Sequence, residues 1–332
     1  MPNNLIGQAT AAANPNLAII KYWGKEEGLD NIPASPSLGI TLDGLHTVTT
    51  ACLTQPKPGG DRVLIDGKPQ PKRRFADFFA KFRKLVDKKN PEMGRFTITA
   101  ESASNFPNSA GLASSASGFA ALALACTRAA ELELPAKELS ALARVGSVSA
   151  ARSVFGGFVR LGSGAIHADQ IHDEAWWPDL RIIVVEIEKG AKEISSRAAM
   201  ERTKRTSPFY RAWISDSKEN MDKSLPALET RNLGILGPLI RRSYLRMFST
   251  MLSSYPPTVY WKPASLAVIA LCERLRIKGL NVWETMDAGP QVKILCLDAE
   301  VPLVMEHLAA EFSNLPTRIC GVGGPPYPDN NG

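Results

Sequence analysis

The spacing of apolar residues along the first hundred positions predicts strands followed by a helix. Residues 40–53 are rich in Thr and Val, and residues 61–69 (DRVLIDGKP) predict a hairpin whose turn lies at Asp66-Gly67. Residues 74–89 carry Phe and Leu at spacings of three and four, which is typical of an amphipathic helix. We therefore expect meandering antiparallel strands, this helix, and a further strand at residues 95–101.

The middle of the chain predicts a buried helix and a buried strand. Residues 114–133 are alanine-rich and apolar nearly all round, and the serines at their start suit a helix N-cap. Residues 180–187 (LRIIVVEI) form a continuous apolar run, as in a strand buried on both faces. Between them we expect a helix at residues 135–145 and a strand at residues 154–161.

From about residue 192 the pattern becomes mainly helical. Helices are predicted at residues 196–204, 211–229, 233–252, 265–278 and 302–312, with strands at 281–285 and 292–298. This change predicts an α+β protein of two units, residues 1–190 and 191–325. The Gly-, Pro- and Asn-rich end, residues 326–332, is expected to be a mobile tail.

Composition narrows the class of protein. A chain of 332 residues with 44% hydrophobic and 22% charged residues is globular, and its length suggests two domains. No apolar run approaches the roughly 20 residues of a membrane span, and the first residues lack the layout of a signal peptide, so we expect a cytoplasmic protein without membrane contact. The five separated cysteines are expected to be buried thiols.

The net charge of +6 is compatible with an anionic small molecule or with nucleic acid. The strongest basic run begins at Lys72-Arg73-Arg74 and continues into the helix predicted at residues 74–89. We interpret it as the solvated face of that helix. The four scattered histidines give little material for a His-based metal site or a Ser/His/Asp triad.

Residues 105–118 (NFPNSAGLASSASG) carry the strongest chemical signal. A loop of Gly, Ala and Ser that leads into a helix offers free backbone N–H groups and the positive end of the helix dipole to a phosphate chain. A flexible loop without a ligand explains the same composition equally well. The segment is neither a Walker loop nor a G-x-G-x-x-G fingerprint, because the lysine and the spacing are absent.

Two further segments can bind anions. Residues 15–25 (PNLAIIKYWGK) form an apolar strand that delivers Lys21, Tyr22 and Lys25 beyond its end, although a core strand with two surface lysines explains it too. Residues 146–158 (GSVSAARSVFGGF) place Ser147, Ser149 and Arg152 where a loop enters a strand. Hydroxyls and a guanidinium suit a carboxylate or a phosphate, while a capped turn with a surface arginine is the alternative.

A fourth segment, residues 285–292 (TMDAGPQV), places Asp287 at a strand end before a Gly-Pro turn. An aspartate there is usually a turn residue. However, the four segments, in this order, resemble the GHMP kinase superfamily and, within it, the diphosphomevalonate decarboxylases. The resemblance implies an α+β GHMP kinase fold with an N-terminal ribosomal-protein-S5-domain-2-like domain and a C-terminal ferredoxin-like domain. Its active site is then expected in the cleft between the two domains.

The resemblance also implies roles for individual residues. Asp287 is expected to face the substrate's tertiary hydroxyl, Lys21 to tune this aspartate, and Arg152 to hold the carboxylate that departs as carbon dioxide. The implied substrate contacts are Asn16, Tyr22, Lys25, Ser147, Ser149, Ser196 and Arg197, with Lys192 and Ser195 in the same segment as the last two. The implied ATP contacts are Asn105, Ser109, Ala110, Gly111, Leu112, Ala113, Ser114 and Ser115, with Ser114 or Ser115 near the Mg²⁺ that ATP carries.

The implied reaction converts mevalonate 5-diphosphate and ATP into isopentenyl diphosphate, ADP, phosphate and carbon dioxide, through phosphorylation of the 3-hydroxyl. This is a step of isoprenoid biosynthesis by the mevalonate pathway, and the family is often dimeric. The sequence departs from the family at Gln291, where asparagine is usual, at Val148 and Ala151, and at residues 33–37 (PASPS).

These departures leave other functions open. Mevalonate 5-phosphate is an alternative substrate and would give isopentenyl phosphate. A mevalonate kinase that releases no carbon dioxide is a second alternative. A basic RNA-binding module is a third; it predicts aromatic residues interleaved with basic ones on one exposed face. The stripe of phenylalanines in residues 74–89 instead suits burial, so we expect no nucleic acid partner.

Overall fold

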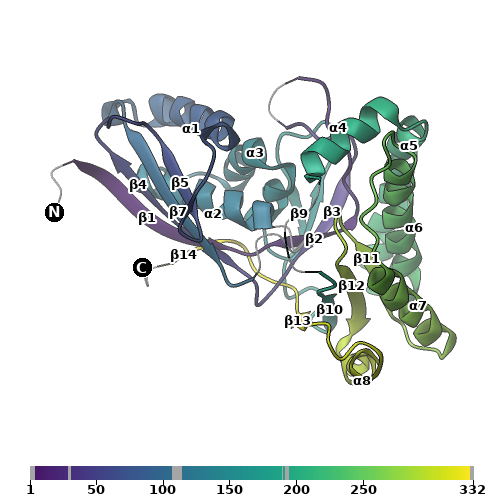
Figure 1. Ribbon diagram of the computed structural model, residues 1–332. Helices are drawn as coiled ribbons and strands as arrows, with labels where there is room; N and C mark the ends of the chain where they lie inside the picture. The colour runs from purple at the N-terminus through teal and green to yellow at the C-terminus, as the bar shows by residue number, and fades with distance from the viewer. Residues whose placement is uncertain (1–3, 29–30, 107–113, 189, 191–193, 330–332) are drawn as a thin grey trace.

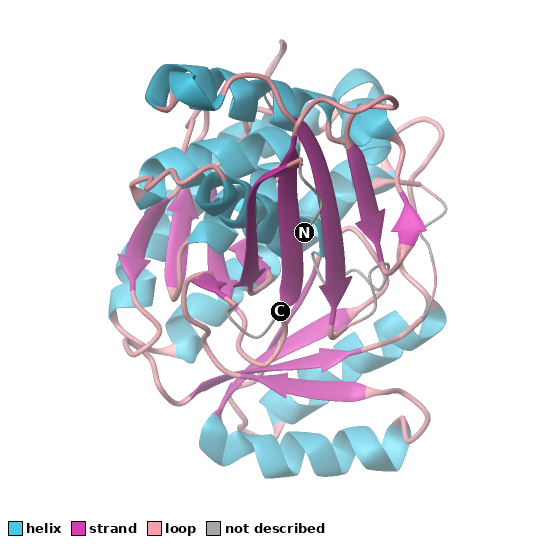
Figure 2. Cartoon of the chain, turned by 90° about the vertical axis from the view of Figure 1, so that its left-hand side faces the viewer, coloured by secondary structure: helices cyan, strands magenta, loops and turns pink. Residues whose placement is uncertain are grey.

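The structure is a computed structural model, which describes residues 4–28, 31–106, 114–188, 190 and 194–329. A six-stranded sheet dominates the N-terminal unit, in the order β14-β1-β4-β7-β5-β6. Its strands are β1 (Leu5–Ala13), β4 (Thr47–Thr54), β5 (Arg62–Ile65), β6 (Lys68–Pro69), β7 (Thr97–Ser104) and β14 (Tyr327–Pro328). Figure 2 shows this sheet facing the viewer, with helices behind it.

The predicted hairpin is confirmed, but the expected antiparallel meander is wrong at one pair of strands. Asp66 and Gly67 connect β5 to β6 with φ values of 49° and 72°, the left-handed conformation that a two-residue hairpin turn requires. β5 and β7, in contrast, are parallel. The connection between them contains α1 (Ala76–Lys89), which returns the chain to the end of the sheet where β5 begins.

Three helices cover this sheet. They are α1, α2 (Ser114–Ala129) and α3 (Ala136–Gly146), and α2 packs against β1 and β4. The predicted stripe of α1 is confirmed, because Phe78, Phe79 and Phe82 are buried while Lys81 and Lys84 are exposed. The aromatic side chains of this basic segment are therefore core residues, which removes the feature that an RNA-binding face would need.

A smaller sheet contains β2 (Asn16–Ile20), β3 (Ser37–Thr41), β8 (Phe158–Leu161) and β9 (Asp169–His172). The sequence predicts a strand from residue 154, but residues 148–154 form the 3₁₀ segment η3 (Val148–Val154), and β8 begins only afterwards. The strands β1, β9, β13 and β14 were not predicted. Each of the last three is short, so alternation of polar and apolar residues carries little signal there.

The C-terminal unit combines a four-stranded sheet with a set of helices (Figure 1). The sheet has the order β11-β12-β10-β13, formed by β10 (Leu180–Val185), β11 (Trp283–Met286), β12 (Val292–Leu297) and β13 (Thr317–Cys320). The helices are α4 (Ser196–Thr206), α5 (Tyr210–Glu229), α6 (Leu233–Leu252), α7 (Pro263–Ile277) and α8 (Val301–Glu311). The expected α+β class and the helices predicted after residue 192 are confirmed.

The pairing of β10 bears on where the two units meet. β10 ends before residue 190, yet it pairs with β12 and β13, so its hydrogen bonds belong to the second unit. We therefore propose a boundary between His172 and Leu180 instead of residue 190. The end of the chain then returns to the first unit, because Tyr327 pairs with Ala12 of β1 in a region where the sequence predicts a mobile tail.

The two units share part of one hydrophobic core. Leu17 and Ile19 of β2 pack in the same cluster as Ile182 of β10 and as Leu236 and Ile240 of α6. β2 is therefore held between the two units. The residues that follow it, from Lys21 onward, are placed at the junction.

The remaining expectations from composition concern cysteines and membranes. All five cysteines are free thiols, and Cys126, Cys272, Cys296 and Cys320 are buried as expected, whereas Cys52 is only partly buried. Within the described ranges, no helix combines the length and the apolar character that a membrane crossing requires.

Candidate active site

Lys21 and Asp287 meet at the junction of the two units. Lys21 directly follows β2 and Asp287 directly follows β11, and the Lys21 Nζ lies 2.7 Å from the Asp287 Oδ1. The Lys21 ammonium also donates to the Ala18 carbonyl at 2.5 Å, and the Lys21 backbone N–H donates to the Ser243 hydroxyl on α6 at 2.8 Å. Both the backbone and the side chain of Lys21 are therefore fixed.

A second lysine, which the sequence did not suggest, contacts the same carboxylate. Lys293 lies in β12, and its Nζ is 3.2 Å from the Asp287 Oδ2. Its side chain is 2% exposed, and that of Lys21 is 1% exposed, whereas Asp287 remains 26% exposed. Each carboxylate oxygen thus has its own ammonium group. The available signal was a lysine inside the otherwise apolar strand VKILCL.

These charges control the protonation of the cluster. Burial alone would raise the pKa of Asp287, but the ammonium groups of Lys21 and Lys293 outweigh it and hold that pKa well below its usual range. Burial lowers the pKa of Lys21 to about 8, against the opposing attraction of Asp287. Burial lowers the pKa of Arg152 to about 10, and the Asp287 charge partly offsets this. Arg152, Lys21 and Asp287 therefore share one electrostatic environment.

Arg152 is buried and held by neutral groups. Its Nε donates to the Asn16 Oδ1 at 3.0 Å, and its NH1 donates to the Ser37 hydroxyl at 2.5 Å. No carboxylate of the described chain lies within salt-bridge distance of this guanidinium. Ser37 belongs to the PASPS segment, in which the sequence showed only a departure from the family. An anion that reaches Arg152 therefore meets a cation without a competing partner.

Hydrogen bonds and a close backbone approach hold Arg152 and its partner Asn16 in place. The Asn16 amide donates to the Ser153 hydroxyl at 2.7 Å and to the Ser149 carbonyl at 2.9 Å, so the acceptor for Arg152 is itself fixed. A Cβ at Gly39 would lie 2.6 Å from the Arg152 Nε, so any larger residue there would displace the Arg152 side chain. Asn16 therefore supports Arg152 in this structure, and the substrate contact that the resemblance implies for Asn16 stays a prediction.

Lys25 and Arg197 meet on one amide. Both donate to the Asn31 Oδ1, and the Arg197 distance is 3.2 Å. Burial, with a contribution from the Arg197 charge, lowers the pKa of Lys25 to about 8. Neither cation forms a salt bridge with any residue that the structure describes. Two cations that share a neutral oxygen make a favourable place for a strongly anionic group.

The other predicted substrate contacts are polar groups around these cations. The Ser147 and Ser149 hydroxyls lie 3.1 Å apart at the start of η3. Ser195 caps α4 by accepting from the Ala198 N–H at 3.2 Å, and Ser196 is the first residue of that helix. The Tyr22 hydroxyl is buried without a hydrogen-bond partner among the described residues, and burial raises its pKa. Lys192 lies outside the described residues.

Most of the predicted ATP loop also lies outside the described residues, namely Ser109, Ala110, Gly111, Leu112 and Ala113. Ser114 and Ser115 open α2, and Ser115 is exposed. The first turn of α2 contains no acidic residue that would repel a phosphate, so this helix start fits a polyphosphate. Asn105, in contrast, is hydrogen-bonded to the turn that leads into β4, with its amide donating to the Gly44 carbonyl at 3.0 Å.

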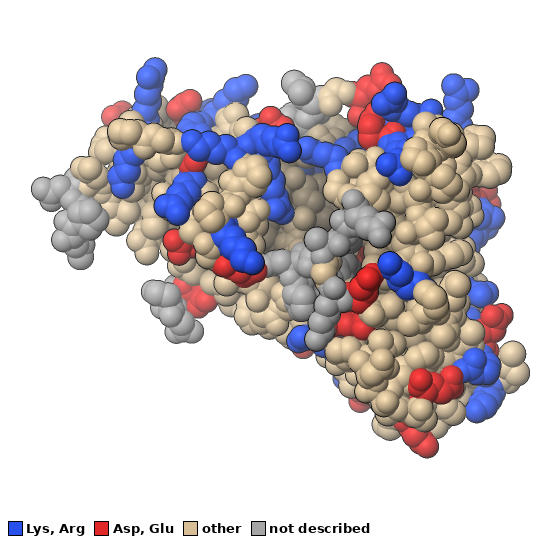
Figure 3. Space-filling view, in the orientation of Figure 1, with Lys and Arg blue, Asp and Glu red and all other residues tan. Residues whose placement is uncertain are grey.

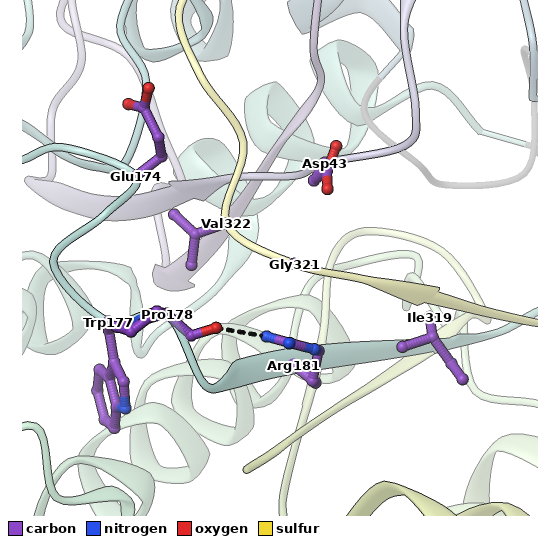
Figure 4. A pocket seen from close by; sticks show the side chains of 8 residues that line it. All are labelled: Asp43, Glu174, Trp177, Pro178, Arg181, Ile319, Gly321 and Val322. Carbon is purple, nitrogen blue, oxygen red and sulfur yellow. Dashed lines mark hydrogen bonds between the residues drawn. The ribbon is translucent and has the colours of Figure 1, made fainter. Parts of the chain in front are cut away.

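Surface charge and cavities add to this description. Figure 3 shows Lys and Arg side chains along the upper edge of the face shown, over α1 and toward α4. A cavity of about 370 Å³ lies elsewhere, lined by residues that include Asp43, Glu174, Arg181 and Ile319 (Figure 4). None of the predicted site residues lines this cavity. In the described ranges no group of three or more His, Cys, Asp or Glu residues could hold a metal ion.

Comparison with known proteins decides the family. Residues 13–172 match the model of the diphosphomevalonate decarboxylase-like N-terminal domain, and residues 182–320 match that of the mevalonate 5-diphosphate decarboxylase C-terminal domain. A diphosphomevalonate decarboxylase of Aspergillus fumigatus is 32% identical over 96% of this chain and 83% of its own length. The chain belongs to the diphosphomevalonate decarboxylase family.

Solved structures of the diphosphomevalonate decarboxylase family have the same fold. The enzyme from Staphylococcus aureus, at 32% identity, has a TM-score of 0.88 over 97% of this chain and 98% of its own. The enzyme from Enterococcus faecalis, at 36% identity, has a TM-score of 0.85 over 97% of this chain and 99% of its own. The expected two-domain GHMP kinase fold is therefore confirmed. A further structure, of MDDEF at 36% identity, contains MVAPP, AMPPCP and magnesium.

Proposed function

We propose that this protein uses Mg-ATP to phosphorylate and decarboxylate mevalonate 5-diphosphate, giving isopentenyl diphosphate, ADP, phosphate and carbon dioxide. The observation that carries this proposal is the Asp287 carboxylate, which is partly exposed and lies between two buried lysines in the same electrostatic environment as Arg152. A kinase that releases no carbon dioxide needs only a group that orients or deprotonates the substrate hydroxyl. A decarboxylase also needs a cation that binds the substrate carboxylate, and Arg152 is available for this role.

The first step concerns the 3-hydroxyl of the substrate. The low pKa of Asp287 keeps it ionised, so it accepts a hydrogen bond from this hydroxyl and either orients it or takes its proton. Lys21 and Lys293 hold the carboxylate in place. Mg-ATP, when bound, supplies the phosphoryl group, and its Mg²⁺ neutralises the negative charge that develops during phosphoryl transfer. The start of α2, with Ser114 and Ser115, is where we place its phosphates.

The second step breaks a carbon–carbon bond. Once the tertiary oxygen is phosphorylated, it leaves as phosphate and positive charge develops on the tertiary carbon. The electron pair of the bond to the carboxylate then forms the alkene, and carbon dioxide is released. Arg152 holds this carboxylate in line, because its planar guanidinium can bind two oxygens at once. Its fixed hydrogen bonds to Asn16 and Ser37 keep the guanidinium orientation during the step.

The 5-substituent of the substrate is placed at Lys25 and Arg197. These two cations converge on the Asn31 amide and suit a group with several negative charges. Ser147, Ser149 and Ser196 add hydroxyl donors, and so does Tyr22, whose hydroxyl has no hydrogen-bond partner among the described residues. This arrangement supports a phosphorylated mevalonate, and the family supports the diphosphate.

The test offers Mg-ATP with mevalonate, its 5-phosphate or its 5-diphosphate, while ADP and carbon dioxide are measured separately. We expect equal amounts of both products with the 5-diphosphate. Equal products with the 5-phosphate alone would show the phosphomevalonate alternative. ADP without carbon dioxide would show a kinase, and no turnover with any substrate would refute the proposal.

We also propose that the protein is a cytoplasmic homodimer. The five free thiols fit a reducing compartment, where ATP is also available. The dimer rests on the resemblance to the family. Light scattering coupled to size-exclusion chromatography tests it, and a mass of one chain across a range of concentrations would contradict it.

A further inference from the structure

We propose that Lys293 is a positioning residue of the reaction, which fixes the Asp287 carboxylate from the side opposite Lys21. The inference deepens the proposed function and rests on it. Lys293 was not among the residues that the sequence or the resemblance suggested. The evidence for its role is the 3.2 Å contact between the Lys293 Nζ and the second oxygen of Asp287.

The apolar surroundings of Lys293 indicate that its charge has a role at this position. Its strand, VKILCL, is buried from Val292 to Cys296, and the lysine side chain is 2% exposed. An ammonium group in such a place costs free energy unless it is paired, and an apolar side chain would fill a strand of this kind at no such cost. The ion pair with Asp287 therefore accounts for a charged side chain in this strand.

Two ammonium contacts fix the orientation of the Asp287 carboxylate more completely than one contact does. With Lys21 alone, the carboxylate of Asp287 could turn about its bond to Cβ and still keep one oxygen on the ammonium group. With Lys293 on the other oxygen, both oxygens are assigned and the plane of the carboxylate is set. The lone pairs that face solvent are then fixed before the substrate hydroxyl arrives, which is the kind of preorganisation that lowers a barrier.

Lys293 also has a distinct electrostatic effect. Its charge lowers the pKa of Lys21 and the pKa of Asp287 together. The other charged group that acts on this pair is Arg152, from η3. Removal of Lys293 should therefore raise both pKa values, whereas a loss of packing alone would move neither in a defined direction.

The experiment compares Lys293→Met with the wild-type enzyme. Methionine keeps the length and burial of the side chain but has no charge. We expect kcat to fall by about 10²-fold with little change in KM, as for a lost preorganising contact. The base limb of the kcat profile should move to higher pH, because Lys21 then keeps its charge to a higher pH. Lys278→Met, which removes an exposed lysine at the end of α7, is the control and should leave kcat and this limb unchanged.

A second readout does not depend on turnover. In free protein labelled with ¹³C at lysine Cε, NMR titration of Lys21 should have its midpoint near pH 8 in the wild type and at higher pH in Lys293→Met. Lys293→Gln provides the same test should the methionine variant not fold. An unshifted Lys21 midpoint, or an unchanged kcat, would overturn the inference. A shifted midpoint in a protein that turns over none of the three mevalonates would instead refute the proposed function and leave the two-lysine arrangement intact.

Discussion

The two ends of the candidate site differ in whether their cations are already paired with a carboxylate. At the Asp287 end, Lys21 and Lys293 already occupy both carboxylate oxygens and are themselves buried. At the other end, Lys25 and Arg197 share only the neutral oxygen of Asn31. The first end is a balanced set of charges, and the second is a set of cations without a counter-charge among the described residues.

This difference separates the work of the reaction from the work of binding. Groups that act on the reacting atoms gain from being fixed before the substrate arrives, because no reorganisation is then needed during the reaction. Cations that bind a phosphate gain from being unpaired, because the ligand does not have to displace a protein carboxylate. Substitutions at the first end should therefore change kcat, and substitutions at the second should change KM.

The largest effect is expected for Asp287→Asn. The amide keeps the size of the side chain but cannot accept a proton or attract the two lysines, so kcat should fall by about 10³-fold. Binding of a non-hydrolysable ATP analogue and of the substrate, measured by calorimetry, should persist. Near-normal turnover would remove Asp287 from the mechanism.

Arg152→Gln is expected to have the next largest effect. Glutamine can still contact Asn16 or Ser37 but has no charge for the substrate carboxylate, so carbon dioxide release should slow by about 10²-fold. Single-turnover measurements should show ADP formed before carbon dioxide in this variant. If both products slowed equally, Arg152 would act on the first step as well.

Lys25→Met tests the unpaired end. One charge-assisted contact to the 5-phosphates is lost, so KM for the phosphorylated substrate should rise by about 10-fold while kcat changes little. Steady-state kinetics give both values, and Lys278→Met again serves as the control. A fall in kcat at constant KM would contradict the division of the site into two ends.

The pH dependence should show the same division. Lys25 has a pKa of about 8 in the folded protein, so substrate binding should weaken above pH 8 as this charge is lost. Its pKa in the unfolded chain is higher, so the unfolded state holds more protons between these values, and the contribution of Lys25 to stability should increase as pH rises through this window. Denaturant unfolding of wild type and Lys25→Met at pH 7 and pH 9 measures the difference. A constant difference would contradict the lowered pKa.

The smallest effect is expected for Gln291→Asn, which restores the residue usual in the family. Gln291 accepts from the Ile187 N–H at 2.5 Å and donates to the Glu188 carbonyl at 2.7 Å, so it ties the Asp287 loop to the end of the strand that precedes α4. Asparagine is one carbon shorter and should lose one of these bonds, lowering the free energy of unfolding by about 1 kcal/mol. Thermal unfolding measures this change, and unchanged stability would show that the shorter side chain reaches both partners.

Local patterns predicted most of the elements that surround the site. The phenylalanine stripe predicted α1, the alanine-rich run predicted α2, and the Gly-Pro turn predicted that Asp287 lies at the end of a strand, which is β11. In these cases neighbours in sequence decide the structure. The resemblance to the family then indicated which residues share the candidate site.

What the sequence did not predict depends on contacts between distant residues. The parallel pairing of β5 and β7 is set by the path of the chain through α1. Lys293 meets Asp287 because β12 lies beside β11, and Ser37 meets Arg152 across more than a hundred residues of chain. The membership of β10 in the second sheet is likewise a matter of partners that come much later in the chain.

The shared core around β2 has a consequence for dissection of the protein. Were the first 172 residues produced alone, the face of Leu17 and Ile19 would lose Ile182, Leu236 and Ile240 and would meet water. The terminal strand β14 would be missing from the edge beside β1 as well. We therefore expect neither half to fold on its own, and gene fusions or recombination that exchange one half should succeed only when the apolar residues on both sides of this shared core are exchanged together.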